Sequence, residues 1–139
     1  LLSQHEVEAI LNAPHLMRLG FLDESGWPAV APVWVLYQDG RLFTTVESGS
    51  RKTRCFEADD RVYFTIDHSG PEGTFGVRGP ARAKVIEDRE LAIQLTKQSL
   101  QKYLGSEEGP MAEALLKDAE AGETAVVELV PLKWAAWSY

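Results

Sequence analysis

A cluster of cationic and hydroxyl side chains is the part of this sequence best suited to do chemistry. Ser50, Arg51, Lys52, Thr53 and Arg54 directly follow a run typical of a β-strand, where the pattern predicts the start of a helix. A helix start has backbone N–H groups without intrahelical acceptors and the positive end of the helix dipole. A hydroxyl, a guanidinium and an ammonium group added there form a socket for a phosphate-sized anion. The alternative is an ordinary solvated helix face.

The charge balance limits which molecule can carry that anion. The chain has 139 residues, with 14 Lys and Arg against 21 Asp and Glu and a formal net charge of −7. Nucleic-acid binding depends on a basic surface that neutralises many phosphates, so this balance disfavours a nucleic-acid partner. One small anionic ligand remains compatible with the composition.

Metal-binding and hydrolytic motifs have no support in the sequence. Cys55 is the only cysteine, and the three histidines lack the spacing of metal ligands, so we expect no metal site. No phosphate-binding P-loop, nucleophile elbow or zinc-protease motif occurs. Catalytic side chains therefore remain unknown at this level.

The hydrophobic runs are too short for a membrane helix. The most apolar run, Ala29 to Tyr37, has about the length of a strand and contains Pro32, whereas a membrane helix needs about 20 apolar residues. No secretory signal pattern opens the chain. We expect one cytoplasmic domain over residues 1–139 that has no membrane partner.

Periodicity and turn signals predict an antiparallel β fold with a few helices. Gly-containing turns between neighbouring runs favour hairpins, because parallel neighbours need a long crossover. Gly76, Gly79 and Pro80 suit a bulge or a sharp bend, and hence a curved sheet. Six or seven strands of this kind predict a mainly β fold, either a small barrel or a sandwich. The expected strands are 15–22, 27–37, 41–47, 61–67, 74–87, 124–130 and 133–138, and the expected helices are 3–13, 50–58, 88–104 and 110–119.

The predicted second strand indicates a partner. Residues 29–37 do not alternate apolar with polar side chains, so both faces of this strand are expected to be covered. A second copy of the chain would cover the outer face, which predicts a symmetric homodimer; the alternative is a single-chain barrel with a helix packed outside. Near the C-terminus, Trp134 is expected to dock either into the core or across the dimer seam, and Trp137 across the seam.

Four segments in order resemble the pyridoxamine 5′-phosphate oxidase-like family of flavin-binding split β-barrels. They are Pro32-Val33-Trp34-Val35, Phe43-Thr44-Thr45, Ser50-Arg51-Lys52 and Lys133-Trp134-x-x-Trp137, and the resemblance extends from about Leu16 to Trp137. It implies a homodimeric split β-barrel with two cofactor sites along the interface. It also implies that the flavin ring lies on the second and third strands, and that the basic turn holds its phosphate.

The resemblance also implies particular cofactor-binding residues. The phosphate would be held by Ser50, Arg51 and Lys52, after a segment that contains Thr44 and Thr45. The strand beside the ring would contribute Val33 and Trp34. The other subunit would contribute Thr74 and Trp137.

The implied cofactor is FMN, with the deazaflavin F420 as the alternative. The founding enzyme of the family is longer and has further basic residues for its substrate phosphate, so vitamin B6 oxidation is not implied. A branch of the family that binds F420 shares the short length and a strand similar to Val33–Val35. We therefore expect an FMN-dependent oxidoreductase with a small-molecule substrate or electron donor. The alternatives are an F420-dependent reductase and a non-catalytic flavin-binding protein.

Overall fold

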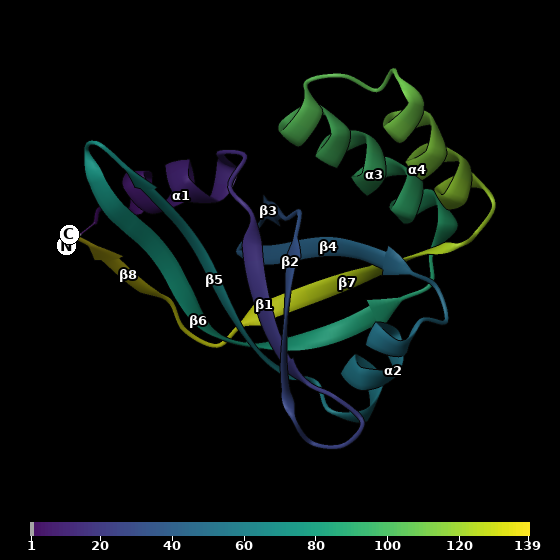
Figure 1. The fold of residues 1–139 in the computed structure, drawn as a ribbon, viewed down its shortest axis with the longest axis horizontal. Helices are drawn as coiled ribbons and strands as arrows, with labels where there is room; N and C mark the ends of the chain where they lie inside the picture. Colours follow the sequence, from purple (N-terminus) through teal and green to yellow (C-terminus); the bar gives the residue numbers. More distant parts are fainter. Residues whose placement is uncertain (1) are drawn as a thin grey trace.

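The computed structural model describes residues 2–139, which form a mainly β fold of eight strands and four helices. None of these helices is long and apolar enough to cross a membrane. The elements, labelled in Figure 1, are α1 (Gln4–Asn12), β1 (Met17–Leu22), β2 (Pro28–Val33), β3 (Leu36–Gln38), β4 (Arg41–Glu47), α2 (Arg51–Ala58), β5 (Arg61–Gly70), β6 (Gly73–Ile86), α3 (Arg89–Leu104), α4 (Pro110–Glu120), β7 (Thr124–Pro131) and β8 (Ala135–Ser138).

The strands form one antiparallel sheet whose two ends are joined by the chain itself. Its order is β2-β1-β5-β6-β7-β4-β3, and β8 pairs with the outer part of β6. Strands β2 and β3 lie at opposite ends of this order, yet only Trp34 and Val35 separate them. The two edges must therefore approach each other, which closes the sheet into a barrel. This agrees with the split β-barrel expected from the sequence.

The prediction of a single strand over residues 27–37 is wrong. Pairing of β2 with β1 ends at Val33, and pairing of β3 with β4 begins at Leu36. The chain leaves the hydrogen-bonded ladder for two residues because it crosses there from one edge of the sheet to the other. The missing alternation in the sequence therefore reflects two short strands with a break between them.

Strand β6 was expected to carry a bulge or a sharp bend at Gly76, Gly79 and Pro80, and its pairing with β5 shows no bulge. Strands β5 and β6 pair without an inserted residue from Arg61↔Arg82 to Gly70↔Gly73. On its other edge, the two residues Gly79 and Pro80 face the three residues 132–134 that connect β7 to β8. A Cβ on Gly79 would overlap the Lys133 carbonyl oxygen. Glycine is required here because the C-terminal segment crosses close to the β6 backbone.

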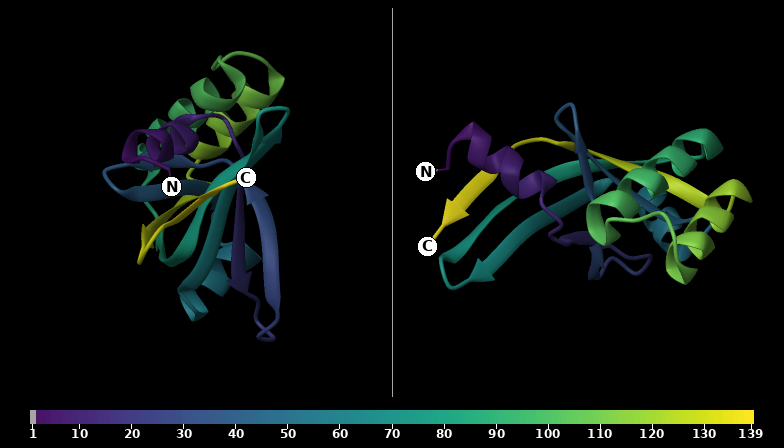
Figure 2. Two further views of the ribbon diagram at one scale, coloured as in Figure 1. Left: turned by 90° about the vertical axis from the view of Figure 1, so that its left-hand side faces the viewer. Right: turned by 90° about the horizontal axis from the view of Figure 1, so that it is seen from above.

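The barrel interior forms the main core, and the helices cover its outside and ends. Phe64, Ile66, Val77 and Leu129 are fully buried there. Helix α2 packs against β1, β4 and β6, whereas α3 and α4 pair with each other over β4 and β7. Figures 1 and 2 show this helical pair on one side of the barrel and α1 towards the end where both termini lie.

Candidate functional site

The residues expected to bind a cofactor fall into three groups in the structure. Ser50, Arg51 and Lys52 form the turn that begins α2, called here the basic turn. Trp34 and Thr45 line a cavity under α3 and α4. The third group is Thr74 and Trp137, on the paired strands β6 and β8 (Figure 1). Val33 and Thr44 accompany the second group in sequence, but their side chains point elsewhere.

The basic turn has the geometry of a capped helix start. Ser50 is the N-cap, and its Oγ accepts a hydrogen bond from the Thr53 N–H at 3.4 Å. The Thr53 hydroxyl donates back to the Ser50 carbonyl at 2.7 Å, and Arg54 donates to the Gly49 carbonyl at 3.0 Å. No acidic residue lies in the first turn of α2. The positive end of this helix is therefore not neutralised from within the helix.

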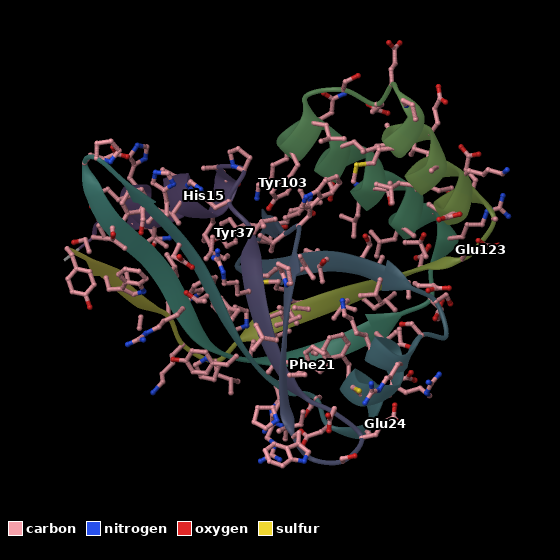
Figure 3. The ribbon with its side chains drawn as sticks, in the orientation of Figure 1. His15, Phe21, Glu24, Tyr37, Tyr103 and Glu123 are labelled. Carbon is pink, nitrogen blue, oxygen red and sulfur yellow. The ribbon has the colours of Figure 1, made fainter. Side chains whose placement is uncertain are left out.

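Arg51 is held by carboxylates of the β1–β2 turn. Its Nε lies 3.3 Å from Glu24 Oε1, and its Nη2 lies 4.0 Å from Asp23 Oδ2. The side chain remains 67% exposed, so these contacts are weak and leave the guanidinium accessible. An anion at this position would compete with the carboxylate of Glu24, which Figure 3 shows in the turn next to α2.

A cavity of about 320 Å³ lies beside the basic turn, and we call it the α2 cavity. Its wall is mainly apolar, with Arg51 and Lys52 at one side. A pocket that combines an apolar wall with a few polar groups is typical of small-molecule sites. The lining residues are Phe21, Asp23, Ala29, Arg51, Lys52 and Cys55.

A second cavity of about 270 Å³, the α3–α4 cavity, lies between the outer face of β4 and the helical pair. Thr45 and Trp34 both line it. Thr44 is only 5% exposed and alternates with Thr45 along β4, so its side chain lies on the same face as the core residue Leu42. Val33 likewise packs against the core. Of the four residues in these two segments, only Thr45 and Trp34 line this outer cavity.

The break between β2 and β3 is held by α3. The Tyr103 hydroxyl accepts a hydrogen bond from the Val35 N–H at 3.0 Å and donates to the His15 carbonyl at 2.8 Å. Lys102 Nζ donates to the Val35 carbonyl at 2.6 Å and to the Leu11 carbonyl at 2.8 Å. Burial lowers the pKa of Lys102 to about 8. The two carbonyl contacts oppose this shift, because they stabilise the ammonium form.

These two α3 residues were missed by the sequence interpretation. Lys102 and Tyr103 lie among charged and apolar positions of an ordinary amphipathic pattern, and nothing in that pattern distinguishes them from surface residues. Only the packing of α3 against the break brings their polar groups to Val35. Trp34 has neither its N–H nor its carbonyl in the sheet ladder, since pairing stops at Val33 and resumes at Leu36.

Thr74 near the start of β6 and Trp137 of β8 lie on paired strands. Figure 1 shows β8 and the β5–β6 hairpin at the far end of the barrel from α2. The Thr74 carbonyl accepts a hydrogen bond from the Tyr139 N–H at 2.7 Å. The Trp137 ring lies over Gly76, where a Cβ would come within 2.7 Å of it. Its Nε1 is buried and has no hydrogen-bond partner among residues 2–139. Trp134, by contrast, packs against Phe64 and Tyr37 of its own chain.

Metal-ligating side chains do not gather in the described part of the chain. Within residues 2–139, no group of three or more His, Cys, Asp or Glu side chains is arranged to hold a metal ion. The polar groups at the candidate sites are hydroxyls, carboxylates and the two cations of the basic turn. Their arrangement can bind and orient a ligand, but it contains no evident acid–base pair.

Comparisons with known proteins identify the relatives of this chain. The model of the family described as pyridoxamine 5′-phosphate oxidase matches residues 3–138. A comparison with curated proteins finds no match.

Solved structures with the same fold share little sequence with the chain. A conserved hypothetical protein from Mycobacterium tuberculosis has a TM-score of 0.82 and 19% identity, over 99% of this chain and 85% of that one. An FAD-binding protein from Mesorhizobium loti has a TM-score of 0.72 and 21% identity, over 99% and 96%. A structure described as an F420 reductase has a TM-score of 0.70 and 20% identity, over 97% and 98%. At identities this low, the structural likeness establishes a common fold.

Proposed function

The chain belongs to the pyridoxamine 5′-phosphate oxidase family, and on this premise we propose that it is an FMN-binding oxidoreductase. The observation that carries the proposal is the start of α2, where Ser50 caps the helix and Arg51 and Lys52 border the α2 cavity. A helix N-terminus with two cations suits the doubly charged phosphate of FMN. Arg51 is 67% exposed, so its guanidinium is accessible to a phosphate, which would have to displace the Glu24 carboxylate.

A homodimer would bring the remaining expected residues to the cofactor. Thr74 and Trp137 lie at the opposite end of the barrel from the basic turn, so in this proposal they reach the cofactor held by a second copy (Figure 1). Trp137 is only partly buried, so the exposed part of its ring is available to a second copy, whereas its Nε1 is enclosed within its own chain. Trp27 and Val30, which are 71% and 70% exposed, offer apolar surface for a partner at β2.

In this proposal the protein binds and orients, and the flavin supplies the hydride or electron transfer. The N–H and carbonyl of Trp34, outside the sheet ladder, would bind the amide edge of the ring. Thr45 would contribute its hydroxyl on the outer face of β4. Val33 and Thr44, whose side chains pack inward, would contribute backbone groups only.

Two alternatives keep the same site. The first is an F420-dependent reductase, favoured by the full-length structural likeness to a protein described as an F420 reductase. The second is a flavin-binding protein without turnover, since the structure offers no evident acid–base pair. Either would use the basic turn for the cofactor phosphate.

The absorption spectrum of the freshly purified protein, followed by mass analysis of the ligand released on denaturation, tests the proposal. We expect the mass of FMN; the mass of F420 would identify the first alternative. If neither cofactor co-purifies or binds on titration, the proposal is rejected. Mixing the flavin-loaded protein with reduced nicotinamide under air then distinguishes turnover from binding alone.

A further inference from the structure

We propose that the α3–α4 cavity binds the positively charged group of a small organic amine. Binding of the amine does not require a flavin, and only its role as a substrate rests on the function proposed above. The cavity has a volume of about 270 Å³, at the small end of ligand sites, which fits a compact molecule. It opens beside Trp34, the residue proposed to lie next to the flavin ring.

The charges of the lining residues determine which charge the cavity favours in a ligand. Three carboxylates, those of Glu47, Asp118 and Glu123, line the cavity, and none of its lining residues is Lys, Arg or His. None of the three carboxylates forms an ion pair among residues 2–139. Figure 3 places Glu123 just before β7, below α4. A phosphate or carboxylate ligand would be repelled, whereas a cation would be attracted.

Two largely buried hydroxyl-bearing residues distinguish this cavity from an ordinary acidic surface. Thr96 and Ser99 of α3 are 5% and 9% exposed, and both line the cavity. Neither hydroxyl has a side-chain hydrogen bond to another residue of the described chain. Among residues 2–139 the only fully buried side-chain polar atom without a partner is Trp137 Nε1, so the two hydroxyls are not sealed in the core and remain accessible from the cavity. Both can accept a hydrogen bond from an ammonium group, which has three donors and no acceptor.

Trp34 supplies an aromatic wall for the same ligand. The face of its ring towards Tyr103 is covered by a parallel stack with centroids 5.0 Å apart. Trp34 also lines the cavity. An ammonium or guanidinium group is attracted to an indole ring by its quadrupole, and more strongly where water is excluded. Carboxylates, hydroxyls and an indole thus converge on one class of ligand, a small organic cation.

Calorimetry or NMR titration with three compounds of similar shape tests the proposal. The probes are butylammonium, the neutral butanol and the anionic butyrate, each added at pH 7 to the protein as purified. We expect butylammonium alone to bind, with an affinity that falls as salt is added. Equal binding of butanol, or no binding of butylammonium, would overturn the proposal.

Matched variants locate the binding. Asp118→Asn and Glu123→Gln should each weaken butylammonium binding about two- to five-fold, the scale of an exposed ion pair. Ser99→Ala should also weaken it, by removing one acceptor without adding bulk. The control is Glu120→Gln, an equal charge change on α4 outside the cavity lining. If the control weakens binding as much as the lining variants do, the cation binds only to the general acidic field and the proposal fails.

The flavin titration and the amine titration test the two proposals separately, so either proposal can be rejected without the other. Butylammonium binding by a protein that binds no flavin would reject the proposed function and leave the cavity assignment intact. FMN binding without any amine binding would reject the cavity assignment and leave the proposed function intact. Thermal unfolding of each variant checks folding, and Ser99→Ala keeps the test decisive if a carboxylate variant does not fold.

Discussion

The rings of Trp34 and Tyr103 lie parallel, with centroids 5.0 Å apart and 4° between their planes. Trp34 lies in the break between β2 and β3, and Tyr103 lies near the end of α3, so the stack joins the barrel to the helical pair. The Tyr103 hydroxyl also bonds to the backbone of Val35 and His15. One residue of α3 therefore fixes the position of the side chain that borders the α3–α4 cavity.

Replacing Tyr103 tests this arrangement. Tyr103→Phe keeps the ring stack but leaves the Val35 N–H and the His15 carbonyl without their partner. We expect the free energy of unfolding to fall by about 1–3 kcal/mol, the cost of a buried unsatisfied group. Tyr103→Leu should cost more, because the stack is lost as well. Urea denaturation measures both, and an unchanged Tyr103→Phe midpoint would contradict the role of the hydroxyl.

Removing a cation from the basic turn tests the phosphate assignment. Arg51→Ala and Lys52→Ala should each weaken FMN binding by about 1.5–3 kcal/mol, which is roughly 10- to 150-fold. Equilibrium dialysis or fluorescence titration measures the dissociation constant. Arg89→Ala is the control, since this cation begins α3 and lines neither cavity. A variant of Arg51 with unchanged affinity would remove the basis of the proposed function.

The carboxylate that now contacts Arg51 should oppose anion binding. Glu24→Gln removes the charge 3.3 Å from Arg51 Nε and keeps the shape of the side chain. We expect FMN or inorganic phosphate to bind up to about five-fold more tightly, the scale of an exposed ion pair. Tighter binding that disappears at high salt would agree with this expectation. Weaker binding would mean that Glu24 itself contributes to the ligand site.

Gly79 should tolerate no side chain. A Cβ there would overlap the Lys133 carbonyl oxygen, so Gly79→Ala must displace the segment between β7 and β8. We expect a loss of about 1–3 kcal/mol in the free energy of unfolding, typical of overpacking. Gly20→Ala in β1 is the matched control, because its Cβ would meet no atom closer than the Tyr63 carbonyl oxygen at 3.4 Å. Equal losses for the two variants would argue against the close crossing.

His15 should make the protein less stable in mild acid. Its pKa is lowered from 6.5, first by burial and then by the nearby charges of His68 and Lys102, with Asp67 opposing. The unfolded chain therefore binds a proton more readily than the folded one as the pH falls through about 6.5. Stability is lost over that range. His15→Phe, which keeps an aromatic ring beside Phe75, should lose less stability than the parent between pH 7.5 and 5.5 in urea denaturation.

Local signals in the sequence predicted most of the elements correctly. The helix expected over residues 3–13 begins with a capping box of Ser3 and Glu6, with hydrogen bonds of 3.1 and 2.7 Å. Helix α2 begins where it was predicted to begin, with Ser50 as its N-cap. Asp88 likewise caps α3, which ends at Gly105 in a left-handed conformation. Such features can be predicted from the sequence because a cap or a hairpin turn depends on residues only a few positions apart.

The sequence by itself determined the mainly β class, the helix starts and the cation cluster at residues 50–52, all of which depend on neighbours along the chain. Only the tertiary structure decided where the second strand breaks, why Gly79 must be glycine, and which residues of α3 meet Trp34. These features join residues far apart in sequence: Tyr103 reaches Val35, and Lys133 reaches Gly79. No local pattern specifies such contacts, because they form only when the sheet closes and the helical pair packs against it.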